Sequence, residues 1–369
     1  MTAAAENSMR IFRAIVQPLL SWYARSARTM PWRLSVPDPY KTLVSEIMLQ
    51  QTRVETVKPY FERFIRELPT ISDLAAADEE RLLKLWEGLG YYSRVRNLQK
   101  AAQKIVTDYG GKIPADSSVL LRLPGIGEYT AGAIASIAFG QPEPAVDGNV
   151  LRVFARLLDY HEDASSPDFR KMVKDGLKKV YPAGHCSDFT QSLMDLGAVI
   201  CLPGHPLCPE CPLSAWCSGF REGTAAALPK KKENPPRRIE NKTVLILRSA
   251  DGLRTALRKR SGKGVLRGLW EYPWLEGFLS KKQVLDYLQS NGFSPLKIRE
   301  LQPCRHVFSH LEWHMNGWLA ECGEEPQDNS LVWTDAQQMR DERPLPSAFR
   351  GFTRQIFPAD RYLLVSRTR

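Results

Sequence analysis

Apolar residues in the first two thirds of the chain recur with the period of amphipathic helices. Residues 78–88 and 168–180 show this pattern, and Asp116 is placed to cap a short helix that begins near Val119. Helices joined by short turns are therefore expected as far as residue 227.

Beyond residue 238 the pattern changes to short runs typical of strands and one further helix. A hairpin is predicted at residues 243–248 and 253–258, a helix at 280–288 and another strand at 313–319. Residues 228–238 are rich in proline and charge, which is typical of a linker. The sequence thus predicts a mainly α domain, residues 1–227, and an α+β domain, residues 239–369.

Composition adds a basic charge to this picture of a globular chain. The 369 residues include 51 Lys and Arg against 41 Asp and Glu, a net charge of +10. Such an excess favours a polyanionic partner, most simply nucleic acid, although a basic surface also serves solubility alone. No stretch is apolar enough for a membrane helix or a signal peptide, so an intracellular, cytoplasmic protein without membrane contact is expected.

Four of the seven cysteines lie close together, at Cys201, Cys208, Cys211 and Cys217. Without a secretory signal, clustered thiols favour a metal site over disulfides. Zinc sites usually present two close pairs, whereas this loop has one, so a [4Fe–4S] cluster is favoured over zinc. The remaining thiols, Cys186, Cys304 and Cys322, are expected to be ordinary buried residues.

A second motif, residues 123–131, places two glycines between predicted helices. Main-chain N–H groups at Gly125 and Gly127, with the N-terminus of the next helix, form a phosphate cradle that needs no charged side chain. An isolated Gly-x-Gly is more often a simple turn. Together with the later cysteine loop, however, it resembles the helix-hairpin-helix of the endonuclease III superfamily of DNA glycosylases.

That resemblance implies a helical glycosylase fold with a structural iron–sulfur cluster whose basic loop meets DNA. His205 and Arg221 are the nearest candidates for such phosphate contacts. Cleavage of an N-glycosidic bond needs a proton for the base and stabilisation of the sugar cation, which two acids of unequal proton affinity provide.

Two acids are candidates for these roles. Asp147, taken alone, is readily explained as a helix N-cap, but it corresponds to the superfamily's catalytic aspartate. Glu46 has apolar neighbours on a predicted helix, where burial would raise its pKa. The residues around it, Ser-Glu-Ile-Met-Leu-Gln-Gln-Thr-Arg-Val, resemble the MutY-type adenine DNA glycosylases, whose general acid is this glutamate.

The same resemblance assigns further residues. Bifunctional members carry a lysine nucleophile where this chain has Tyr129, so a monofunctional enzyme is expected, with Tyr129 and Asn149 supporting the aspartate and the sugar cation. Gln51, Thr52 and Tyr91 match family positions that wedge beside the opposing base. Trp32, Arg33 and Gln191 match positions that line the adenine pocket, and Leu123, Gly125 and Gly127 match positions of the helix-hairpin-helix. By composition alone, Tyr91 is equally a core aromatic.

The second domain resembles a Nudix domain at residues 268–273. The magnesium-binding Nudix box would require Glu and Arg where Gln283 and Asn291 stand, so a Nudix-like fold without hydrolase activity is expected. In MutY-type enzymes this domain recognises 8-oxoguanine. Phe308, Ser309 and His310 match the reading loop; the alternative, that the histidines here form a surface or metal tract, is disfavoured.

These features imply a monomeric base-excision repair enzyme that hydrolyses adenine from double-stranded DNA where it faces 8-oxoguanine or guanine. Three alternatives stay open: an endonuclease III-like pyrimidine-damage glycosylase with lyase activity, a non-enzymatic iron–sulfur DNA-binding sensor, and a Nudix hydrolase. Tyr129 and the extra C-terminal domain disfavour the first alternative, and the missing box disfavours the third. The second would need neither Glu46 nor Asp147, so variants at these residues discriminate it from the enzyme.

Overall fold

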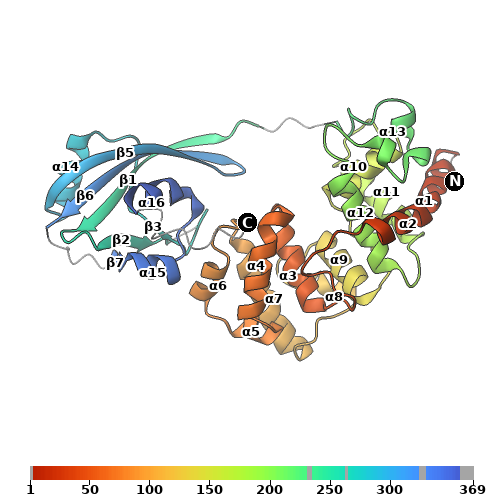
Figure 1. The fold of residues 1–369 in the computed structure, drawn as a ribbon, viewed down its shortest axis with the longest axis horizontal. Helices are drawn as coiled ribbons and strands as arrows, with labels where there is room; N and C mark the ends of the chain where they lie inside the picture. The colour runs from red at the N-terminus through yellow and green to blue at the C-terminus, as the bar shows by residue number, and fades with distance from the viewer. Residues whose placement is uncertain (1–2, 231–234, 262–264, 324–329, 358–369) are drawn as a thin grey trace. The chain divides into compact units, whose positions relative to one another are not determined.

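The computed structural model describes residues 3–230, 235–261, 265–323 and 330–357, and its ribbon is drawn in Figure 1. It divides into two compact units, residues 1–77 with 93–233 and residues 78–92 with 234–369. The short segment 78–92 thus belongs with the C-terminal residues, although it lies within the helical part of the sequence. The linker prediction falls partly on residues 231–234, outside the described residues, and the domain boundaries stay a prediction.

The first unit is built of helices, as the apolar period predicts. Its α-helices are α1 (Ala3–Ala14), α2 (Val16–Ser26), α3 (Pro39–Leu49), α4 (Val54–Glu67), α5 (Ile71–Ala76), α7 (Ser93–Tyr109), α8 (Ser117–Leu120), α9 (Glu128–Phe139), α10 (Gly148–Leu157), α11 (Pro167–Lys178), α12 (Cys186–Val199) and α13 (Ser218–Arg221). Two short 3-10 turns, Cys208–Glu210 and Ser214–Trp216, lie in the cysteine loop. Asp116 caps α8, accepting a hydrogen bond from the backbone N–H of Ser118, so the predicted N-cap is confirmed.

Five of these helices enclose one apolar core. Phe12 of α1 stacks on Phe154 of α10 with ring centroids 4.8 Å apart, and Phe169 of α11 and Phe189 of α12 complete the layer. Gly176 of α11 meets the Phe12 ring so closely that an added Cβ would lie 2.5 Å from it. This packing fixes α10, whose N-cap is Asp147, and α12, which ends just before the cysteine loop.

The second unit is a mixed sheet with helices on both faces (Figure 1). Its elements are α6 (Glu79–Leu85), β1 (Arg238–Ser249), β2 (Arg254–Lys259), β3 (Trp270–Glu271), β4 (Trp274–Glu276), α14 (Lys281–Ser290), β5 (Pro295–Val307), β6 (Leu311–Cys322), β7 (Val332–Asp335), α15 (Ala336–Asp341), a 3-10 turn (Ser347–Phe349) and α16 (Arg350–Ile356). The strand order is β3-β2-β1-β6-β5, with β4 paired to β1 and β7 to β2. The pair β1 and β6 is parallel, whereas the other pairs are antiparallel.

Strand β1 shows why the sheet is covered on both sides. Successive side chains of a strand point to opposite faces. Val244 and Ile246 pack with α16, whereas Leu245 and Leu247 pack with Val284 of α14. The predicted hairpin, helix and strand at 243–258, 280–288 and 313–319 are all present, but β5, which alternates poorly, was not predicted.

Among the described residues, no helix is both long and apolar enough to span a bilayer.

Candidate active site

Helix α3 carries Glu46 into the interior. Asp38 caps this helix by accepting hydrogen bonds from the backbone N–H groups of Tyr40 and Lys41, and Pro39 follows at the first helical position. Every residue from Thr42 to Met48 is buried, so α3 is enclosed on all sides. The Glu46 side chain is therefore only 5% exposed despite its charge.

One hydrogen bond and two charges surround the Glu46 carboxyl group. The Tyr129 hydroxyl, from the first turn of α9, donates to Oε2 at 2.8 Å. Burial raises the pKa of Glu46 from 4.5 to about 7, opposed by the Tyr129 hydrogen bond, while the Asp147 charge raises it further and the Arg33 charge lowers it. At neutral pH this group is divided between acid and carboxylate, as a general acid requires.

Asp147 both caps α10 and faces the same pocket. Its Oδ1 accepts from the backbone N–H of Val150 and its Oδ2 from the Asn149 side-chain amide, each at 2.8 Å. Both oxygens act as acceptors, as those of an ionised carboxylate do. The N-cap explanation and the functional one are thus compatible, because the capping geometry itself orients the carboxylate.

A pocket of about 200 Å³ brings the two acids together within the first unit. Sequence-predicted residues that line it are Trp32, Arg33, Glu46, Thr52, Tyr129, Asp147, Asn149 and Gln191. Trp32 forms part of its wall, with its ring edge-on to Phe61 at 5.3 Å. Gln191 donates from Nε2 to the Ser187 hydroxyl at 3.1 Å. Residues on five separate stretches of sequence therefore meet around one space: 32–33, 46–52, 129, 147–149 and 191.

Three charged residues in or next to this site were not predicted: Arg28, which lines the pocket, and Arg152 and Asp195, which hydrogen-bond to residues that line it. Arg152 donates from Nη2 to Asn149 Oδ1 at 3.0 Å and from Nε to the Cys201 carbonyl oxygen at 2.9 Å. It thereby turns the Asn149 amide so that its NH₂ group faces Asp147. The only sequence signal for Arg152 is its place one turn after Asn149 on the same helix.

The remaining predicted first-unit positions lie outside the pocket lining. Gln51, directly after α3, is exposed with φ +55°, a left-handed conformation that costs energy in a residue with a side chain. Leu123 is only 3% exposed, so its side chain belongs to the core. Gly125 has φ +76°, and no hydrogen bond in the described part of the chain uses the amide N–H of Gly125 or Gly127.

The predicted positions of the second unit lie on two turns. Tyr91, with φ +47°, is 47% exposed, so it is not a core aromatic. Phe308, Ser309 and His310 form the tip of the β5–β6 hairpin, closed by the bond from the Phe308 N–H to the Leu311 carbonyl oxygen. The Phe308 ring packs edge-on against Trp313 at 4.9 Å, while Ser309 and His310 are exposed.

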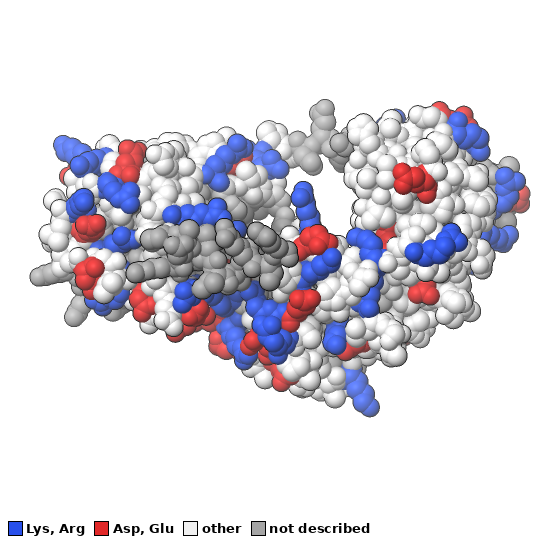
Figure 2. Space-filling view, viewed as in Figure 1, with Lys and Arg blue, Asp and Glu red and all other residues white. Residues whose placement is uncertain are grey.

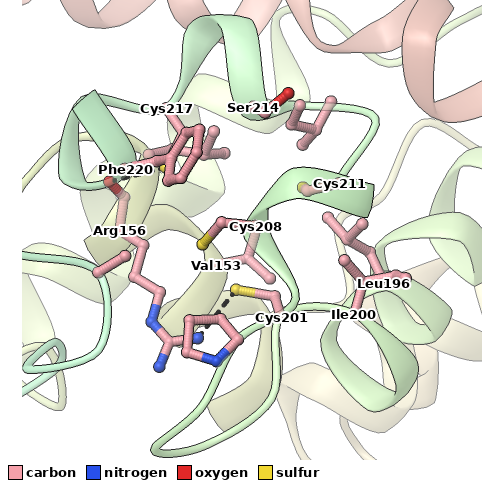
Figure 3. A pocket seen from close by; sticks show the side chains of 14 residues that line it. Val153, Arg156, Leu196, Ile200, Cys201, Cys208, Cys211, Ser214, Cys217 and Phe220 are labelled. Carbon is pink, nitrogen blue, oxygen red and sulfur yellow. Dashed lines mark hydrogen bonds between the residues drawn. The ribbon is translucent and has the colours of Figure 1, made fainter. Parts of the chain in front are cut away.

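The four clustered cysteines line a second pocket, shown in Figure 3. Its other walls are mainly apolar, from α10, α12 and the loop itself. Among the described residues, no three His, Cys, Asp or Glu side chains are arranged to hold one metal ion. The four thiols nevertheless line one shared space, and thiolates are soft ligands of the kind that hold zinc or iron–sulfur clusters.

The Arg156 guanidinium indicates whether the cysteine pocket suits an anionic group such as an iron–sulfur cluster. It is 2% exposed and donates from Nη1 to Cys201 Sγ at 3.2 Å (Figure 3). Its Nη2 has no hydrogen-bond partner among the described residues. A buried cation with an unused donor needs a nearby negative charge, and an iron–sulfur cluster held by four thiolates is anionic.

The helical fold, the helix-hairpin-helix turn and the acid pair in one pocket are features of a DNA-repair glycosylase. In agreement, the HhH-GPD superfamily of base excision DNA repair proteins matches residues 44–179, and the NUDIX domain matches residues 243–355. The chain belongs to the adenine DNA glycosylase family, as the resemblance in the sequence predicts. It is accordingly an enzyme of base-excision repair that binds DNA and acts on adenine.

Individual relatives support this assignment. The adenine DNA glycosylase of Rattus norvegicus is 35% identical over 370 residues, covering 85% of this chain and 72% of that protein. The Homo sapiens enzyme is 34% identical, covering 84% and 68%. A thermostable thymine-DNA glycosylase has a TM-score of 0.53 at 30% identity, covering 58% of this chain and 98% of its own. A non-covalent endonuclease III–DNA complex has a TM-score of 0.50 at 26% identity, covering 58% and 97%.

The environment of Glu46 makes its titration a test of the site. In protein labelled with ¹³C at glutamate carboxyl groups, the resonance lost in Glu46→Gln is expected to titrate near pH 7. Asp147→Asn removes a charge that raises the pKa, so the midpoint moves to lower pH. Tyr129→Phe removes a hydrogen bond that lowers it, so the midpoint moves to higher pH. A native midpoint near pH 4.5 would contradict the buried position of Glu46.

Proposed function

We propose that the enzyme, acting as a monomer, hydrolyses the N-glycosidic bond of adenine opposite 8-oxoguanine or guanine in duplex DNA, without strand cleavage. The observation that carries this proposal is the pairing of Glu46, which holds a proton near neutral pH, with Asp147 in one pocket. Glu46 protonates the departing adenine ring, and Asp147 stabilises the cationic sugar until water attacks.

The absence of an amine supports the monofunctional reaction. Among the described residues that line the pocket there is no lysine, and Tyr129 is engaged with Glu46. Burial and the nearby Glu46 and Asp147 charges raise the pKa of Tyr129 well above its usual value, so the phenol keeps its proton. No amine among the described residues of the pocket is therefore placed to attack the sugar and form a Schiff base.

Access to the base requires that adenine leave the helix and that the gap be filled. We assign Gln51 and Tyr91, with Thr52, to this role. The first two are non-glycine residues held at positive φ, a costly conformation that functional sites commonly retain. Thr52 accepts a hydrogen bond at its hydroxyl from buried Arg94, which also binds the carbonyl groups at the end of α3.

Backbone contacts are assigned to the helix-hairpin-helix, at residues 123–127. The amides of Gly125 and Gly127 precede the N-terminus of α9, where a phosphate is favoured. In the view of Figure 2, Lys and Arg are interspersed with acidic and uncharged residues and form no continuous basic face. We therefore assign the backbone contacts to this local phosphate site and not to a broad positive surface on the face drawn.

A reading role for the opposite base is assigned to the hairpin tip in the second unit. Phe308, supported by Trp313, offers an apolar ring, and the exposed Ser309 hydroxyl both donates and accepts hydrogen bonds. 8-Oxoguanine differs from guanine in the C8 carbonyl and the N7–H, so one hydroxyl placed at that edge distinguishes the two bases.

We further propose that Cys201, Cys208, Cys211 and Cys217 hold a [4Fe–4S] cluster. When bound, the cluster fixes the cysteine loop and compensates the buried Arg156 charge. It lies in a pocket separate from the acid pair, so its contribution is to structure.

A base-release assay tests the reaction. Duplexes carrying adenine opposite 8-oxoguanine or guanine are expected to lose adenine without strand cleavage, and borohydride is expected to trap no enzyme–DNA adduct. Duplexes with damaged pyrimidines serve as controls and should release nothing. Glu46→Gln should bind the same duplexes with activity lowered by at least about a hundredfold. Pyrimidine release with a trapped adduct would support the glycosylase/lyase alternative instead.

Discrimination at the opposite base is tested by the double variant Ser309→Ala with His310→Ala. Loss of the hydroxyl contact should reduce the preference for 8-oxoguanine over guanine about tenfold while leaving adenine release from the guanine mispair intact. Ser290→Ala, at an exposed position of the same unit, is the matched control. An unchanged preference would exclude the hairpin tip from base reading.

The cluster is tested by colour and metal content. Protein purified without oxygen should be brown, absorb broadly at about 400 nm and contain iron and sulfide. Cys211→Ala should lose this absorption, whereas Cys322→Ala, a buried thiol of the second unit, should keep it. Colourless protein with one zinc ion per chain would refute the cluster.

A further inference from the structure

A buried carboxylate stands behind the wall of the active-site pocket. Asp195, on α12, is fully buried and accepts hydrogen bonds from Arg33 Nη1 at 2.7 Å and Nη2 at 2.8 Å. Arg28 adds bonds from Nε at 2.9 Å and Nη2 at 2.6 Å. Burial alone would raise the pKa of Asp195, but the bonds from Arg33 and Arg28 lower it, so it stays ionised.

The two arginines, unlike Asp195, line the pocket beside Glu46. Arg33 Nη1 also donates to the Arg28 carbonyl oxygen at 3.2 Å, so the guanidinium is held from two sides. One carboxylate faces two cations, which leaves a surplus positive charge in this wall. Buried ionic networks contribute little net stability, because removing charges from water is costly, so this one calls for a functional explanation.

We propose that Asp195 is a positioning residue for the reaction: it fixes Arg28 and Arg33 in the pocket wall and screens their charge, which keeps the proton on Glu46. The inference deepens the proposed function, since it rests on Glu46 as the general acid. No hydrogen bond among the described residues joins Asp195 to Glu46, so Asp195 acts through Arg33.

The groups facing Glu46 define the sign of this effect. They are Arg33 from the segment before α3, Tyr129 from α9 and Asp147 from α10. Arg33 lowers the pKa of Glu46, and Asp195 offsets that charge at hydrogen-bond distance from the guanidinium. Loss of the Asp195 charge leaves Arg33 unscreened, so the pKa of Glu46 falls and less of the acid form is present at neutral pH.

The pH dependence of single-turnover adenine release tests this role. In the native enzyme the rate is expected to fall as pH rises through about 7. This fall is the alkaline limb of the pH–rate profile. Asp195→Asn, which keeps the side-chain shape, should move the limb to lower pH by about one unit, so that the rate is about tenfold lower at pH 8 and changes little at the acid plateau. Asp188→Asn, exposed on the same helix, is the matched control and should leave the limb in place.

Two further variants separate charge from structure. Arg33→Gln alone should move the limb to higher pH, and it tests the coupling even if Asp195→Asn fails to fold. Combined with Asp195→Asn, it should cancel the downward shift. A uniform loss of rate at every pH, or a shift that persists in the double variant, would overturn the inference. Absence of adenine release by the native enzyme would instead refute the proposed function.

Discussion

The burial of one carboxyl group is the constraint around which the first unit is arranged. Glu46 sits on a helix whose neighbouring residues are all enclosed, and an isolated carboxylate there would pay a large desolvation cost. The Tyr129 hydrogen bond limits that cost without abolishing it. The result is a group that holds its proton at a pH where an exposed glutamate has lost it. Ordinary packing thus gives Glu46 the proton affinity that its proposed role as general acid needs.

Close approaches between helices bring the other groups to Glu46. An added Cβ at Gly132 of α9 would lie 2.4 Å from the Pro144 carbonyl oxygen, just before Asp147. At Gly197 of α12 it would lie 2.8 Å from the Asn149 Cβ. Any side chain at either glycine would push α9 or α12 away from the segment that carries the aspartate. Two glycines therefore set the separation between the tyrosine, the aspartate and its amide partner.

Local signals in the sequence predict the elements well and their long-range pairing poorly. The spacing of Cys201 to Cys217 and the string around Glu46 lie within single segments, so their pattern is readable. Asp195 and its two arginines are separated by 162 and 167 residues, and no local period connects them. The parallel pairing of β1 with β6 and the grouping of residues 78–92 with the C-terminal unit are non-local in the same way.

Asp147 shows why a structural explanation and a functional one need not compete. As the N-cap of α10 it must accept a backbone hydrogen bond, and that bond holds one oxygen in place. The Asn149 amide, turned by Arg152, holds the other. A carboxylate fixed at both oxygens keeps its orientation, so stabilising the sugar cation of the proposed reaction would require little reorganisation. The capping interaction, which is the simpler explanation of Asp147 from the sequence, also holds its carboxylate in the orientation that the proposed role requires.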